Sequence, residues 1–170
     1  MAQAYLLTGM PGTGKTSLIR QALTQSKCNA GGFFTQEIRN VGVREGFQIV
    51  TLDGKEGMLA HIGIDSPFHV GKYAVDVSVL DDIGVNAIYS ALESKDVVVI
   101  DEIGKMELFS PRFIKAVQDA LTSNKKILGT ITLKPHPLAD TIKQSRFIRL
   151  AELTRNNQRP ILAEILAWLK

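Results

Sequence analysis

The residues from 9 to 16 have the types and the spacing of a phosphate-binding loop. They satisfy the pattern G-x-x-x-x-G-K-[ST], in which a glycine-rich backbone turns its N–H groups inward around an anion. In that pattern Lys15 is placed to reach the β- and γ-phosphates, and Thr16 to offer its hydroxyl to Mg²⁺. A glycine-rich turn can precede a helix by chance, but here every fixed position is filled. The residues predicted to bind a nucleoside triphosphate are Gly9, Met10, Pro11, Gly12, Thr13, Gly14, Lys15 and Thr16, with Lys15 also catalytic.

A pair of acidic residues, Asp101 and Glu102, directly follows the unbroken apolar run 97–100. Such a run is typical of a strand buried on both faces of a parallel sheet, and ligands bind at the carboxyl ends of such strands. We expect Asp101 to bind Mg²⁺ together with Thr16, and Glu102 to accept a proton from an attacking water. The alternative interpretation is that the two acidic residues are solvated charges that simply end a strand. The presence of a phosphate-binding loop makes this interpretation less favoured.

The stretch from Asp101 to Gly104 also fits D-x-x-G, the switch pattern of GTPases, which adds Gly104 to the predicted nucleotide-binding residues. A GTPase is disfavoured because no Asn-Lys-x-Asp follows. The nearest fragment, 124–127, reads Asn-Lys-Lys-Ile and lacks the aspartate that would read guanine.

Transfer of a γ-phosphoryl group spreads negative charge over oxygen atoms, so a further cation is expected near the site. The candidates are Arg39, Arg44, Lys105, Arg146 and Arg149, and for each of them a solvated surface position is the simpler interpretation. Glu107 is interpreted either as a partner that orients Lys105 or as surface charge. Thr130 is a candidate sensor of the γ-phosphate or of water, although a threonine in a strand is more often only a strand former.

The elements that must position these residues alternate between strand and helix. An apolar strand at 4–8 precedes the loop, and a helix follows it. Patterns of β-favouring residues and turns predict an antiparallel β-hairpin insertion over 32–63, followed by a loop over 64–71. Later elements are helices near 79–92, 111–122 and 159–169 and strands near 72–75, 97–100, 126–133 and 147–150, with a short helix between the last two. This order predicts an α/β fold, a mainly parallel sheet with helices on both faces, as a single domain over 1–170.

Composition limits the class of protein. Of 170 residues, 45% are hydrophobic and 22% charged, as in ordinary globular proteins, and the net charge of +3 does not support nucleic-acid binding. Cys28 is the single cysteine, and the three histidines are far apart in sequence, so neither predicts a zinc site. No apolar run approaches membrane-spanning length and no signal peptide is evident, so we expect a cytoplasmic protein.

Several blocks together resemble one family, the small nucleoside-triphosphatases that comprise a cancer-related human enzyme and thermophile enzymes. The resemblance runs in the same order along nearly the whole chain, and its most distinctive block reads Asp-Glu-Ile-Gly-Lys-Met-Glu-Leu at 101–108. The other blocks are 9–16, 32–39, 46–52, 70–76 and 127–131.

This resemblance implies a three-layer P-loop NTPase fold, RecA-like or nucleotide-kinase-like. It also implies Mg²⁺-dependent hydrolysis of ATP, GTP, CTP and UTP to the diphosphate and phosphate, with low base selectivity. It favours Arg39 and Lys105 among the candidates for the further cation, because both lie within the resembling blocks. It also matches Asn157 to an asparagine that often precedes arginine near the last helix of the family. Here Gln158 follows instead, and the arginine is Arg159.

Two alternatives stay open at this stage. A nucleoside or nucleotide kinase would use an acceptor in place of water, although no arginine-rich lid is visible. A nucleotide-switched module that binds RNA or protein is the other. The physiological substrate, the assisting cation and the oligomeric state are not determined by the sequence.

Overall fold

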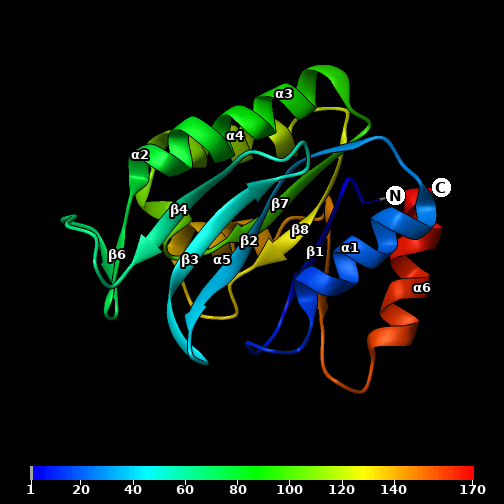
Figure 1. The fold of residues 1–170 in the computed structure, drawn as a ribbon. Coiled ribbons are helices and arrows are strands. Elements are labelled where there is room, and N and C mark those ends of the chain that lie inside the picture. Colours follow the sequence, from blue (N-terminus) through cyan, green and yellow to red (C-terminus); the bar gives the residue numbers. More distant parts are fainter. Residues whose placement is uncertain (1) are drawn as a thin grey trace.

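Within residues 2–170, a nine-stranded sheet forms the middle layer, in the strand order β5-β6-β4-β3-β2-β7-β8-β1-β9. The computed structural model describes residues 2–170, and Figure 1 shows helices on both faces of this sheet. The predicted α/β, three-layer fold is therefore confirmed. The strands are β1 Ala4–Thr8, β2 Ala30–Asn40, β3 Val43–Thr51, β4 Glu56–His61, β5 His69–Val70, β6 Tyr73–Val75, β7 Val97–Ile103, β8 Lys126–Ile131 and β9 Ile148–Glu152.

The helices lie in two layers. α1 and α6 cover one face, where α1 packs beside α6, and the helical segment from α2 to α3 covers the other face together with α4 (Figure 1). No helix within residues 2–170 is long and apolar enough to cross a membrane. The helices are α1 Lys15–Ser26, α2 Val77–Val79, the π-helical turn η1 Leu80–Val85, α3 Asn86–Ser94, the 3-10 turn η2 Glu107–Phe109, α4 Pro111–Leu121, α5 Pro137–Lys143 and α6 Gln158–Leu169.

The two faces of the sheet bury separate cores. On the α3–α4 face the ring of Phe33 meets that of Phe113 edge-on, with the ring centres 6.2 Å apart. On the α1–α6 face the rings of Tyr5 and Trp168 pack together with their centres 5.8 Å apart, so Trp168 is a packing residue. Burial on both faces holds the parallel strands rigidly in place.

One half of the sheet is parallel. β8 lies between β1 and β7 and pairs in parallel with both, and β9 extends the sheet beyond β1. The carboxyl ends of β1, β7 and β8 therefore meet at one edge, which is where open α/β sheets bind ligands.

The other half is antiparallel and begins inside β2. Residues 30–33 of β2 pair in parallel with β7, whereas residues 33–40 pair antiparallel with β3. The antiparallel strands predicted over 32–63 are present, but they continue the central sheet as a ribbon of β2, β3, β4, β6 and β5. The prediction of a loop over 64–71 was wrong at His69–Val70, which pairs with β6 across a tight turn at Gly71, where φ is +58°.

The helix predicted near 79–92 contains a π-helical turn around Gly84. A Cβ atom at Gly84 would stand 2.8 Å from Cδ1 of Ile49, so the glycine lets the helix approach β3 closely. The π-helical turn Leu80–Val85 is a π-bulge, in which the backbone hydrogen bonds span one more residue than in an α-helix.

The junction between the two halves of the sheet depends on Gly32, and we predict that Gly32→Ala destabilises the fold. Gly32 has φ +111°, and a Cβ there would stand 2.0 Å from the carbonyl oxygen of Val99. We expect the free energy of unfolding in urea to fall by about 3 kcal/mol or more, because strain and steric overlap add.

Gly54→Ala is the matched control, since Gly54 has φ +97° but nothing within 4 Å of an added Cβ. It is expected to cost about 1 kcal/mol, from the backbone conformation alone. Equal losses in the two variants would contradict the close approach at Gly32.

Candidate functional site

The glycine-rich loop joins β1 to α1 in the manner that the sequence predicts. Gly9, Gly12 and Gly14 all have positive φ, at 144°, 81° and 89°, which only glycine adopts without strain. A Cβ at Gly9 would stand 2.6 Å from the carbonyl oxygen of Leu153, so the loop lies tightly against the segment that follows β9. The loop ends where α1 begins at Lys15, so the positive end of the helix dipole points at it.

The ammonium group of Lys15 folds back over the loop. Its Nζ donates hydrogen bonds to the carbonyl oxygens of Gly9 at 2.9 Å and Met10 at 3.0 Å. The Thr13 hydroxyl also donates to Met10, at 3.0 Å. Lys15 is thus positioned over the concave side of the loop, where an anion would be held.

The side chain of Asp101 connects the loop to the sheet. Its Oδ2 accepts a hydrogen bond from Thr16 Oγ1 at 2.6 Å, across 85 positions of sequence. Its Oδ1 accepts one from Thr130 Oγ1, also at 2.6 Å. Asp101 is 3% exposed, and burial raises its pKa, while the bonds from Thr130 and Thr16 and the charge of Lys15 oppose that rise. The structure therefore brings Thr16, Asp101 and Thr130 together.

Glu102 lies in the same cavity as Lys15 and Thr16. Burial raises the pKa of this carboxyl, the charge of Asp101 raises it further, and Lys15 lowers it. A carboxylate with a raised pKa is a better proton acceptor than an exposed one, which suits the predicted role of Glu102.

A second carboxyl group, that of Glu107, lies beside Glu102. A Cβ at Gly104 would stand 3.1 Å from both Glu102 Cδ and Glu107 Oε2, so the two acids share one small space around that glycine. Glu107 is only 4% exposed, and burial together with the charge of Glu102 raises its pKa well above the usual range. The interpretation of Glu107 as surface charge was wrong.

The site cavity has a volume of about 520 Å³ and reaches well beyond the loop. Of the residues considered from the sequence, Lys105, Arg44 and Thr130 line it, whereas Gly104 lies beside the carboxyl groups of Glu102 and Glu107 and does not line it. The cavity is lined by Gly9, Met10, Pro11, Gly12, Lys15, Thr16, Thr35, Glu37, Arg44, Phe47, Leu59, Val70, Asp101, Glu102, Lys105, Met106, Glu107, Thr130, Thr132, Leu133 and Lys134.

The other arginine candidates lie outside this lining. Arg39 forms an ion pair with Glu37 at 2.7 Å near the tip of the β2–β3 hairpin. Arg149 pairs with Glu164 of α6, and Arg146 lies over the ring of Phe147 at 4.8 Å.

Asn157 holds the turn before α6 by accepting from the N–H of Thr154 and donating to the carbonyl of Glu152. The contact with the phosphate-binding loop comes from its neighbour. Gln158 Nε2 donates to the Thr13 carbonyl at 2.8 Å. The departure from the family pattern at Gln158 thus falls on a residue that fixes the loop.

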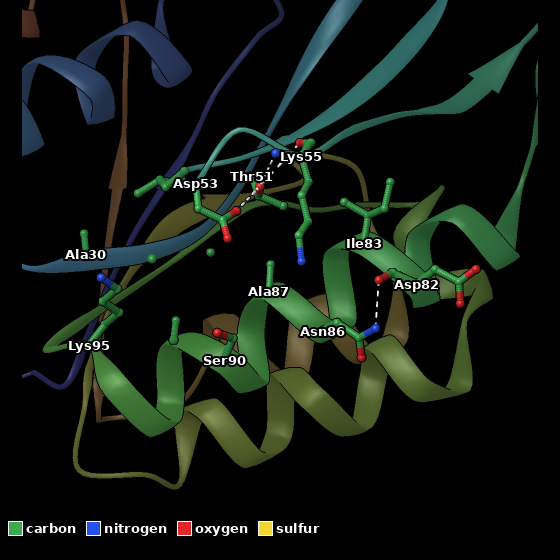
Figure 2. Close-up of a pocket in the computed structure, with 14 residues that line it drawn as sticks. Ala30, Thr51, Asp53, Lys55, Asp82, Ile83, Asn86, Ala87, Ser90 and Lys95 are labelled. Carbon is green, nitrogen blue, oxygen red and sulfur yellow. Dashed lines mark hydrogen bonds between the residues drawn. The ribbon is translucent and has the colours of Figure 1, made fainter.

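A second cavity, of about 260 Å³, lies between α3 and the β3–β4 turn (Figure 2). It adjoins residues 30–32, at the amino end of the parallel strands, and so opens away from the loop. Figure 2 shows the polar groups that stabilise the β3–β4 turn. The Thr51 hydroxyl donates a hydrogen bond to the Asp53 carboxylate, and the Lys55 N–H donates to Thr51 Oγ1 at 2.8 Å. These contacts account for Thr51 and Asp53 as turn residues.

Comparison with known proteins connects this arrangement to one family. The sequence model of a family described as NTPase matches residues 4–166. The nucleoside-triphosphatase THEP1 of Thermotoga sp. (strain RQ2) is 45% identical over 165 residues, which cover 97% of this chain and 94% of the relative. The human cancer-related nucleoside-triphosphatase is 40% identical over 186 residues, covering 100% and 98%. The crystal structure of THEP1 from Aquifex aeolicus superimposes with a TM-score of 0.89 at 33% identity, covering 98% and 99%.

The burial of Glu107 generates a prediction about stability and pH. Its native pKa lies above the unfolded value, so the native state retains a proton that the unfolded chain releases. Stability therefore falls as pH rises above about 4.3, the usual pKa of glutamate. Because glutamine does not ionise, we expect Glu107→Gln to gain stability relative to the wild type between pH 5 and pH 8, measured by urea unfolding.

Glu93→Gln removes the same charge from an exposed position and is the control. A stability difference between Glu107→Gln and wild type that is the same at both pH values would contradict the assigned environment.

Proposed function

The chain belongs to the nucleoside-triphosphatase family of THEP1 and the cancer-related enzyme, and from this premise we propose how and where it hydrolyses its substrate. The proposed reaction is Mg²⁺-dependent hydrolysis of nucleoside triphosphates to the diphosphate and phosphate, in the cavity between residues 9–16 and the carboxyl end of β7. The observation that carries this proposal is the convergence of Thr16 and Thr130 on Asp101, with Glu102 and Lys15 in the same cavity.

The residues at Asp101 suit a magnesium ion. The Thr16 hydroxyl and the Asp101 carboxylate are hard oxygen donors, which Mg²⁺ prefers. Burial disfavours the ionised form of Asp101, so a cation beside it would stabilise that form. We propose Thr16 and Asp101 as its protein ligands. When bound, the ion would neutralise charge on the phosphate oxygens.

Residues of the chain itself bind the phosphates, stabilise the developing charge and accept the proton. The loop N–H groups and the N-terminus of α1 bind the phosphates, and Lys15 turns from the loop carbonyls to the γ-phosphate. Glu102 takes the proton from the attacking water, while Lys15 stabilises the charge that develops on the γ-phosphate oxygens. Thr130, held by Asp101, is proposed to orient the water or the γ-phosphate.

The proposal includes low base selectivity. It is supported by the family resemblance and by the lack of a guanine-reading Asn-Lys-x-Asp motif in the sequence. Lys105, at the exposed edge of the cavity, is the proposed additional cation, because Arg39 and Arg149 do not line the cavity and are each engaged in an ion pair. The cytoplasmic location stays a prediction.

Phosphate release from ATP, GTP, CTP and UTP, each with Mg²⁺ and with excess EDTA, tests this proposal. We expect phosphate from all four substrates at rates within about tenfold, and loss of release without the metal, because the ion offsets the phosphate charge. Release that persists in EDTA, or from one nucleotide alone, would overturn the metal dependence or the low selectivity respectively.

Glu102→Gln tests the proton acceptor. We expect the turnover number to fall by about 10²- to 10⁴-fold, the usual contribution of general base catalysis, while nucleotide affinity is retained. Lys15→Ala is the comparison, in which affinity and turnover should weaken together. Stopped-flow binding of a fluorescent nucleotide and phosphate release separate the two effects, and unchanged turnover in Glu102→Gln would remove Glu102 from this role.

A further inference from the structure

The first residue of the last helix, α6, contacts the phosphate-binding loop from outside the site cavity. Gln158 Nε2 donates a hydrogen bond to the Thr13 carbonyl oxygen at 2.8 Å, across 145 positions of sequence. Gln158 does not line the cavity, whereas Gly12 and Lys15, which flank the contact in the sequence, do. The Thr13 carbonyl therefore points away from the cavity and towards α6, which lies beside α1 (Figure 1).

The direction of this carbonyl fixes the direction of the next N–H group. In a planar trans peptide the C=O and N–H bonds point in opposite directions. Because Gln158 holds the Thr13 carbonyl outward, the N–H of Gly14 turns inward, to the side of the loop on which Lys15 Nζ lies. Inward N–H groups are what a phosphate-binding loop offers to its anion.

The peptide between Thr13 and Gly14 needs a partner to hold it in this orientation. Gly14 has φ +89°, and glycine adopts positive and negative φ about equally readily, so rotation of this peptide meets little steric resistance. The Thr13 hydroxyl donates to the Met10 carbonyl at 3.0 Å, which fixes the Thr13 side chain and leaves its carbonyl free to turn. The hydrogen bond from Gln158 is the contact that selects one orientation.

Gln158 is itself placed by a rigid turn. Asn157 Oδ1 accepts from the N–H of Thr154 at 2.7 Å, and Asn157 Nδ2 donates to the carbonyl of Glu152 at 2.8 Å. A Cβ at Gly14 would stand 3.2 Å from Gln158 Nε2, so the amide group lies directly against the loop. The segment between β9 and α6 thus presents one amide donor to the loop at a fixed position.

We propose that Gln158 is a positioning residue for phosphate binding: it holds the Thr13–Gly14 peptide so that the Gly14 N–H donates to a phosphate of the substrate. This inference rests on the proposed function, in which the loop N–H groups bind the triphosphate. Donation to the Thr13 carbonyl also polarises the peptide, which strengthens its N–H as a donor. Because Gln158 acts through the peptide and not on the base or the sugar, its effect is the same for a nucleotide and for inorganic tripolyphosphate.

Gln158→Met tests this role, because methionine has a similar length and shape but no N–H donor. Affinity is measured with Mg²⁺ as displacement of a fluorescent nucleotide, once by a non-hydrolysable ATP analogue and once by inorganic tripolyphosphate. We expect both affinities to fall by about three- to tenfold, the net contribution of one hydrogen bond. Gln158→Arg, whose guanidinium can donate to the same carbonyl, should keep both affinities at the wild-type level or above.

Gln118→Met is the matched control, since it makes the same substitution at an exposed position of α4 and should leave both affinities unchanged. Weaker binding of the ATP analogue alone would show that Gln158 contacts the base or the sugar. Unchanged affinity for both ligands would show that the peptide is held without Gln158. Either result overturns the proposal. A wild type that binds neither ligand would refute the phosphate site itself, and the same series of measurements recognises that outcome separately.

The amide proton of Gly14 reports on the peptide directly. A hydrogen bond to phosphate moves an amide proton downfield in a ¹H–¹⁵N spectrum, and we expect this shift when saturating tripolyphosphate is added to the wild type or to Gln158→Arg. In Gln158→Met the shift should be smaller, because the N–H is no longer held towards the anion. An equal shift in the wild type and in Gln158→Met would reduce Gln158 to a structural contact and overturn the proposal.

Discussion

The hydrogen bonds of Asp101 are the interaction on which the site depends. Its two carboxylate oxygens accept from hydroxyls on α1 and on β8, so one buried side chain sets the distance between the phosphate-binding loop and the sheet. Breaking either bond would leave a buried polar group without its partner, which is costly. The positions of Lys15 and Glu102 follow from this arrangement, because each is the sequence neighbour of a bonded residue.

The sheet gives the cavity its two sides. Its parallel half brings β1, β8 and β7 together at their carboxyl ends, and its antiparallel half turns away from β7 through β2 to form the opposite wall. The close approach at Gly32 joins the halves without a break, so the loop, the acids and the ribbon belong to one rigid layer.

Much of this could be predicted from the sequence, because local patterns determine local structure. The loop at 9–16 and the apolar run before Asp101 each carry a short-range signal, and the predicted element formed at both places. The inward orientation of Glu107 could not be predicted, since it depends on a single 3-10 turn with no periodicity. Nor could the pairing of β2 with β7, or the cavity along the ribbon, because both depend on contacts between distant segments.

We infer that residues 9–16 and residues 101–102 form one nucleotide site. A crystal structure with Mg²⁺ and a non-hydrolysable ATP analogue would test this inference. We predict the triphosphate in the loop, the ion bound by Thr16 and Asp101, and the Glu102 carboxylate within one water molecule of the γ-phosphate. A triphosphate bound elsewhere, or Asp101 and Glu102 turned away from it, would contradict a shared nucleotide site.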